Sequence, residues 1–114
     1  MRNKISDKER IIHIFEAIDS ILEFTKGIFY HQYSEDYKLK LAIVKLFEII
    51  GEGANGITEE TQLQFPEIEW PVLKSVRNVL VHEYFGIDYE IIWYAIKEKI
   101  PELKLKISDI LENI

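Results

Sequence analysis

RNVLVHEYFGID, residues 77–88, is the stretch around which the chain is organised. It places an arginine, a histidine and a tyrosine near the end of a helical pattern that Gly86 terminates. No other segment contains so many side chains that could take part in binding or catalysis. Arg77, His82 and Tyr84 are therefore the first candidates for a functional site.

The helix that carries this stretch begins at Pro71 and has two distinct faces. Each residue of an α-helix advances by roughly 100°, so with Arg77 at zero Lys74 lies at about +60°, Asn78 at about +100° and His82 at about +140°. The opposite side is apolar and predicts a core-facing surface formed by Val72, Leu73, Val76, Val79 and Leu80. Lys74 and Asn78 are thus the polar neighbours of Arg77 and His82.

The chain before this helix contains two long helical patterns. Ser6 and Glu9 form a capping box for the first, which is expected to end at Gly27. The second begins after Asp36, runs from residue 37 to about residue 52, and is apolar on more than one face. We expect it to be a central helix and also a subunit interface.

Three glycines, Gly51, Gly53 and Gly56, follow the apolar part of the second helix. They predict a bend or a close approach of another backbone. No strand precedes them and no Gly-Lys-Ser/Thr sequence follows, so they do not indicate a phosphate-binding loop.

The remaining elements are marked by local signals. The aromatic connection of residues 28–33 should pack on the bundle. Thr58 caps a short helix that stops before Pro66, Asp88 caps a helix over residues 89–99, and Pro101 begins or kinks a last helix. The pattern predicts an all-α, up-and-down bundle of four to six helices in a single domain of residues 1–114.

Composition narrows the function classes. The chain has no cysteine, which excludes disulfides and thiolate metal sites and fits a cytoplasmic location, and it has no apolar run long enough for a membrane span. Its net charge of −6 argues against general nucleic-acid coating. His13 has only Glu9 and Glu16 as possible further metal ligands on its helix, so it is predicted to be a structural or surface histidine, and the same is predicted for His31. No metal or other cofactor is expected.

Arg77 and His82 suit cleavage of a phosphodiester without a metal. A histidine exchanges protons near neutral pH, and an arginine binds phosphate oxygens with two parallel hydrogen bonds. RNA is the expected substrate because its 2′-hydroxyl can act as the nucleophile, whereas DNA lacks that group. The structural alternative is that Arg77 pairs with Glu69 or Glu83 and His82 caps carbonyls at the helix end.

The angle between Arg77 and His82 has a further consequence. Positions about 140° apart on one helix cannot both face one small group. If two copies pack around a two-fold axis, Arg77 of one copy can approach His82 of the other. The sequence therefore predicts a composite site in a homodimer.

The spacing Arg77-x4-His82-x-Tyr84 resembles the Arg-x4-His-x-Tyr motif of HepT-like toxins, a branch of the HEPN superfamily. The resemblance covers nearly the whole chain, through residues 47–52, residues 66–70, residues 82–88, Trp93 and residues 101–103. It implies a homodimeric helical bundle that acts as a metal-independent endoribonuclease. Arg77 and His82 carry over as the catalytic pair and Asn78 as a supporting residue, while Lys74 is the additional cation on that face.

The same resemblance implies a toxin–antitoxin pair. The partner would be a minimal nucleotidyltransferase antitoxin that inactivates the toxin by AMPylation of Tyr84. An alternative function is a non-catalytic accessory subunit that presents a nucleotide or a substrate to the nucleotidyltransferase. RNA cleavage in the presence of a chelator distinguishes the two.

Overall fold

The computed structural model describes residues 6–82 and 86–114, without the side chains of residues 78–82. The described residues form helices and no strands, as expected for an all-α protein. The helices are α1 (Asp7–Thr25), α2 (Tyr30–Glu35), α3 (Tyr37–Asn55), α4 (Glu59–Gln64), α5 (Trp70–His82), α6 (Tyr89–Glu98) and α7 (Ile100–Asn113). None of the described helices is both long and apolar enough to cross a membrane.

Side-chain caps fix where the helices begin. The Glu9 backbone N–H donates to Ser6 Oγ at 3.1 Å, and the Ser6 N–H donates to the Glu9 carboxylate at 3.3 Å, which confirms the capping box. Asp36 accepts the Leu39 N–H at 3.0 Å at the start of α3. Asp88 accepts the first N–H groups of α6. These polar groups satisfy backbone donors that have no partner within the helix.

Glycine and proline fix other boundaries. Gly27 follows the end of α1 with a φ of 71°, a conformation that glycine adopts without steric cost. Pro66 lies between α4 and α5, Pro71 lies in the first turn of α5, and Pro101 lies in the first turn of α7. The predictions for these boundaries are confirmed to within a few residues.

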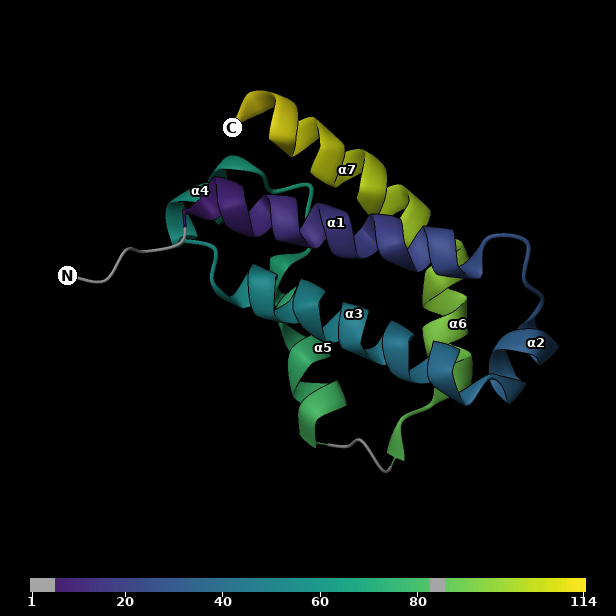
Figure 1. The fold of residues 1–114 in the computed structure, drawn as a ribbon. Helices are drawn as coiled ribbons and strands as arrows, with labels where there is room; N and C mark the ends of the chain where they lie inside the picture. The colour runs from purple at the N-terminus through teal and green to yellow at the C-terminus, as the bar shows by residue number, and fades with distance from the viewer. Residues whose placement is uncertain (1–5, 83–85) are drawn as a thin grey trace.

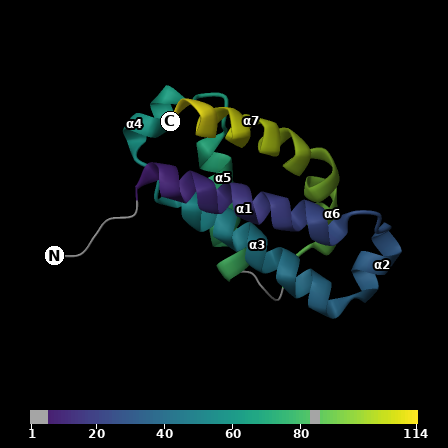
Figure 2. The ribbon, with the colours of Figure 1, turned by 45° about the horizontal axis from the view of Figure 1, so that its top comes forward.

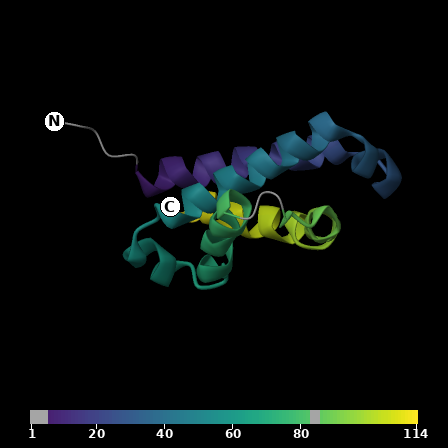
Figure 3. The same ribbon diagram turned by 90° about the horizontal axis from the view of Figure 1, so that it is seen from below.

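The long helices are arranged in two layers. α1 lies between α3 and α7, and both of these run antiparallel to it (Figure 1). Seen from below, α1 and α3 form one layer, with α5, α6 and α7 on one side of it (Figure 3). α2 lies at one end of the molecule and α4 at the other, near the C-terminal end of α7 (Figure 2). α3 contacts α1, α2 and α5, which confirms its predicted central position.

Isoleucine dominates the core between the layers. Burial of branched apolar side chains from several helices is the main source of stability in such a domain. Fully or almost fully buried isoleucines come from α1, α3, α6 and α7 and are Ile11, Ile14, Ile18, Ile21, Ile43, Ile50, Ile96, Ile100, Ile107 and Ile110. Between residues 39 and 50 of α3, Leu41 is the one apolar side chain that is exposed, at about half of its surface; the others are buried or partly buried. Most of the wide apolar surface of α3 is therefore covered within one chain.

α2 is the element that the sequence did not predict as a helix. Its first N–H groups receive no side-chain cap from Phe29, although the Phe29 N–H donates to Gln32 at 2.8 Å. Tyr33 anchors α2 instead, because it is fully buried, its ring lies 4.8 Å from that of Trp93, and its hydroxyl donates to the Tyr89 carbonyl at 3.2 Å. The predicted packing of the aromatic connection is thus confirmed, and α2 brings the helices in the described part of the chain to seven, where four to six were expected.

Candidate active site

Gly51 determines where α5 meets α3. A Cβ atom at Gly51 would lie 2.7 Å from the backbone nitrogen of Arg77 and 2.8 Å from its Cβ, which is closer than real Cβ contacts. Gly53, on another side of α3, would similarly collide with Ile14 of α1. The close approach predicted for the glycines is therefore confirmed, and it places the backbone of Arg77 directly against α3.

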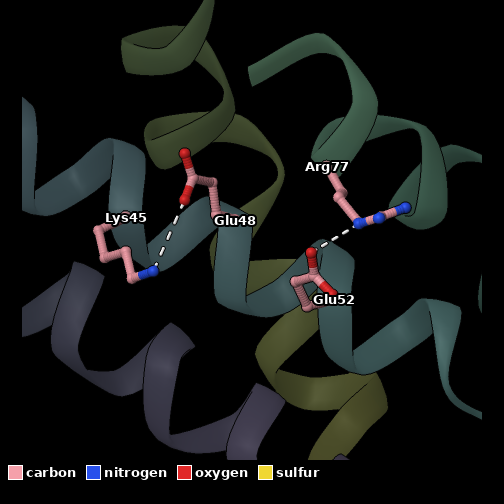
Figure 4. A network of polar contacts seen from close by, with 4 residues as sticks. All are labelled: Lys45, Glu48, Glu52 and Arg77. Carbon is pink, nitrogen blue, oxygen red and sulfur yellow. Dashed lines mark hydrogen bonds and ion pairs between the residues drawn. The ribbon is translucent and has the colours of Figure 1, made fainter. Parts of the chain in front are cut away.

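Glu52 binds the guanidinium of Arg77. The Arg77 Nε–H donates to Glu52 Oε1 at 2.6 Å, and Figure 4 shows this bond joining α5 to α3. The Arg77 side chain remains 39% exposed and that of Glu52 58% exposed. The bond engages one of five guanidinium N–H groups, and the terminal nitrogens lie beyond it. Arg77 is thus accessible to a ligand while one of its donors is held.

This ion pair differs from the structural alternative drawn from the sequence. Arg77 pairs with Glu52 of α3 and not with Glu69, the residue that immediately precedes α5. The other candidate partner, Glu83, lies outside the described residues. Glu52 was missed as a site residue because 25 positions separate it from Arg77 in the sequence. Two signals were present: the neighbouring Gly51, which marks a close helix contact, and the family resemblance over residues 47–52, which include Glu52.

A polar groove opens between α1 and α3 beside Glu52. It has a volume of about 310 Å³ and is lined by Arg10, His13, Lys45, Glu48, Ile49, Glu52 and Gly53. Lys45 pairs with Glu48 at 3.7 Å, and these residues lie about two turns and one turn of α3 before Glu52 (Figure 4). Glu52 lines the groove and also binds Arg77, so it links the groove to the arginine, which is not itself a lining residue. His13 is exposed there, as predicted for a surface histidine.

Lys74 lies one turn before Arg77 on α5 and is directed toward α4. Its amine donates to the Gln62 side-chain oxygen at 3.2 Å. The structure therefore holds the two cations of α5 by different elements, Lys74 by α4 and Arg77 by α3. Both side chains are partly exposed.

The other predicted site residues are covered only in part. Asn78 and His82 belong to α5, but their side chains lie outside the described residues, and Tyr84 lies wholly outside them. α5 is helical through His82, so Arg77 and His82 occupy positions about 140° apart around its axis. The geometric reason for expecting a composite site therefore applies to the observed helix.

A second hollow, with a volume of about 290 Å³, lies between α5 and α7. Apolar side chains such as Ile50, Leu73, Val76 and Leu103 line most of it, and charged groups including Lys99 and Lys106 also contribute. An apolar surface is poorly suited to a phosphodiester, which carries a charge that must be solvated or paired. The polar groove beside Arg77 is the better match for nucleic acid.

His31 takes no part in either hollow. It is exposed, and its ring stacks on Phe29 with centroids 6.1 Å apart. This agrees with its prediction as a structural or surface residue. Among the described residues, no three His, Cys, Asp or Glu side chains are grouped so that they could hold a metal ion.

Comparison with known proteins identifies a family over most of the chain. Residues 14–110 match the family described as Ribonuclease HepT-like. A probable ribonuclease HepT of Thermococcus cleftensis is 39% identical over 103 residues, which cover 90% of this chain and 94% of the relative. A candidate RNase of Methanocaldococcus jannaschii is 34% identical over 101 residues, with 89% and 93% covered. No solved structure matches the chain.

Proposed function

Because the chain belongs to the HepT-like family of ribonucleases, we propose that it is a metal-independent endoribonuclease and the toxin of a toxin–antitoxin pair. The observation that supports this most directly is the placement of Arg77. Its side chain is partly exposed, its guanidinium is held by Glu52 at 2.6 Å, and Glu52 also lines a polar groove. A fixed, accessible guanidinium is what electrostatic stabilisation of a reacting phosphate requires.

In the proposed reaction His82 acts as the general base. It removes the proton of a ribose 2′-hydroxyl, and the resulting oxygen attacks the adjacent phosphorus. The bond from phosphorus to the 5′-oxygen of the next nucleotide breaks, and that oxygen takes a proton from water. The products are a 2′,3′-cyclic phosphate and a 5′-hydroxyl.

Arg77 stabilises the charge that grows on the non-bridging phosphate oxygens during this attack. Its terminal nitrogens can donate two parallel hydrogen bonds to those oxygens while Nε–H stays bound to Glu52. Asn78 is a supporting polar residue on the same helix, and Lys74 offers a further positive charge one turn away. No step requires a metal or another cofactor.

The RNA strand would run along the groove between α1 and α3. Arg10, His13 and Lys45 line this groove, and they can contact phosphates that flank the one being cleaved. This local arrangement lets a chain with a net charge of −6 bind a polyanion. RNA lacking flanking phosphates should therefore bind more weakly.

Two copies would form the complete site. Since Arg77 and His82 lie about 140° apart on α5, one copy supplies the arginine and the other the histidine for each phosphate. The exposed Val72 of α5 and the half-exposed Leu41 of α3 offer apolar surface for such an assembly. The homodimer and the nuclease activity are thus parts of one proposal.

Regulation would act on Tyr84, which lies two residues after His82. A nucleotidyltransferase antitoxin would transfer AMP from ATP to the Tyr84 hydroxyl and release pyrophosphate. The test is the mass of the protein after incubation with the partner and ATP, compared with Tyr84→Phe treated in the same way. A mass increase in multiples of one AMP is expected only with Tyr84 present, and an unmodified Tyr84 would contradict this part of the proposal.

The nuclease claim is tested by incubating purified protein with RNA in excess chelator. The unmodified chain should cleave RNA to fragments with 2′,3′-cyclic phosphate ends, and His82→Ala and Arg77→Ala should not. Both variants should also relieve growth inhibition in cells. Absence of cleavage by the unmodified chain would favour a non-catalytic accessory subunit.

A further inference from the structure

Glu52 does more than join two helices. We propose that it is a positioning residue for Arg77, which holds the guanidinium so that its terminal nitrogens face the phosphate of the RNA. This inference rests on the proposed function, because it concerns the same cleavage reaction. It adds a residue of α3 to a site whose motif residues all lie in or just after α5.

The contact has the geometry of a fixed clamp. Gly51 brings the backbone of Arg77 against α3, and Glu52 is the next residue along that helix. Both ends of the Arg77 side chain are therefore restrained by neighbouring residues of α3, the backbone by Gly51 and the Nε atom by Glu52 at 2.6 Å. A long, flexible side chain that is restrained in this way loses less freedom when it binds a ligand.

The atom that Glu52 binds matters for the chemistry. A carboxylate on the terminal nitrogens would compete with the phosphate for the paired donors. Glu52 instead accepts from Nε–H, at the inner side of the guanidinium. The outer donors can then serve substrate without breaking the ion pair.

The exposure of the pair argues against a mainly structural role. With side chains 39% and 58% exposed, solvent screens the attraction between the two charges. Exposed ion pairs of this kind contribute little to folding stability. Loss of Glu52 should therefore leave the protein folded and affect chiefly the orientation of Arg77.

The charge of Glu52 predicts how the kinetic constants change. Its carboxylate lines the groove and partly offsets the attraction of Arg77 for RNA before the reaction. Removing it should leave KM unchanged or lower, while kcat falls because Arg77 no longer meets the growing charge in a fixed orientation. A residue needed only for RNA binding would give the opposite change, a higher KM at constant kcat.

The matched control is the Lys104–Asp19 pair. It joins α7 to α1 at 2.8 Å, its side chains are 41% and 48% exposed, and it lies outside the groove beside Arg77. Asp19→Ala therefore removes an interhelical ion pair of similar length and exposure. Any effect of losing such a pair on the fold should be equal in Asp19→Ala and Glu52→Ala.

The kinetic test compares cleavage of RNA by the unmodified full chain, Glu52→Ala, Glu52→Gln and Asp19→Ala. We expect Glu52→Ala to reduce kcat at least about tenfold without raising KM, as for a misplaced catalytic group. Glu52→Gln keeps an acceptor for Nε–H, so its kcat should lie between those of Glu52→Ala and the unmodified chain. The kcat of Asp19→Ala should equal that of the unmodified chain. Equal kcat values for Glu52→Ala and the unmodified chain, or a higher kcat in the variant, would overturn the proposal.

A second measurement does not depend on cleavage. The chain has three arginines, Arg2, Arg10 and Arg77, so their Nε–Hε signals can be resolved by nuclear magnetic resonance and that of Arg77 identified by its loss in Arg77→Lys. Glu52→Ala should shift this signal and speed its exchange with water, and Asp19→Ala should not. An unchanged Arg77 signal would overturn the proposal that Glu52 positions Arg77. Failure of the unmodified chain to cleave RNA would instead contradict the proposed function.

Discussion

At Arg77 the shape of the side chain matters as much as its charge. The guanidinium donates to Glu52 through Nε and can still present two donors to a phosphate, because its N–H groups lie in one plane. A lysine amine has no such arrangement and cannot serve both partners in the same way. The pairing of an inner donor with a protein carboxylate therefore explains why this position needs arginine.

Substituting Arg77 with lysine tests this point. Arg77→Lys keeps the charge but loses the paired donors, and we expect kcat for RNA cleavage to fall by about 10²-fold or more. Thermal unfolding should change little, because the Arg77 side chain is partly exposed. Cleavage within about twofold of the unmodified chain would show that charge alone suffices at this position.

Among the elements, the contact between α3 and α5 depends on the absence of a side chain at Gly51. In Gly51→Ala the new Cβ would meet the backbone and Cβ of Arg77, which cannot move without displacing α5. We expect a loss of about 1–3 kcal/mol in the free energy of unfolding, as for overpacked sites. Denaturant unfolding measures it, and cleavage should fall as well.

Gly56→Ala is the control for this substitution. There the nearest atoms to the new Cβ belong to the guanidinium of Arg10, the far end of a flexible side chain, so stability should stay within about 0.5 kcal/mol of the unmodified chain. A similar loss in both variants would mean that the close approach at Gly51 has no special role.

Asp7 joins the beginning of α1 to the beginning of α4. Its carboxylate accepts from the Thr58 N–H at 3.1 Å and from the hydroxyls of Thr58 and Thr61, each at 2.6 Å. Burial alone would raise the pKa of this carboxyl, but these hydrogen bonds outweigh burial and hold the pKa of Asp7 below its ordinary value of 3.8. The ionised form is therefore bound more tightly in the folded protein than in the unfolded chain.

The sign of this shift predicts an acid-dependent contribution to stability. Because the folded-state pKa is lowered, the contribution is present above the ordinary value of 3.8 and is lost as pH falls through the folded-state value. At pH 7 we expect the free energy of unfolding of Asp7→Ala to be about 1 kcal/mol lower than that of the unmodified chain. This difference in the free energy of unfolding should vanish in strong acid. Denaturant unfolding across pH measures this, with the exposed Asp109→Ala as control; a difference that persists in strong acid would contradict the assignment.

The sequence predicts most elements because their ends are set by local chemistry. Ser6, Asp36, Thr58 and Asp88 each cap a helix next to them in the chain, and no distant contact is needed to recognise this. α2 was missed because Tyr33 and the rings around it stabilise it from elsewhere in the fold. A six-residue helix is not stable by itself, so its own sequence carries little signal.

On the scale of the whole molecule, some features of the active site can be recognised from neighbouring residues in the sequence, and others depend on contacts between distant parts of the chain. The motif residues Arg77, His82 and Tyr84 are close in sequence and were recognised by their spacing. Glu52 and the groove depend on how α3 meets α5 and α1, which no local pattern specifies. The proposed second copy is a still more distant contribution, and only the angle between Arg77 and His82 indicates it.

Mixing two inactive variants tests the composite site. Arg77→Ala and His82→Ala homodimers should each be inactive, but after unfolding and refolding together they should recover up to about a quarter of the unmodified activity. Half of the dimers would then contain both variants, and each of these would have one intact site. Recovery is measured by RNA cleavage, with each variant refolded alone as control, and a mixture as inactive as its parts would contradict a shared site.

The central claim is that Arg77 and His82 cleave RNA without a metal, and one assay tests it most directly. Purified full-length protein is incubated with RNA in excess chelator beside His82→Ala and Arg77→Ala, with thermal unfolding showing that all three are folded. We expect fragments with 2′,3′-cyclic phosphate ends from the unmodified chain and none from either variant. Cleavage that stops when the chelator is added, or that persists in folded His82→Ala, would contradict the claim.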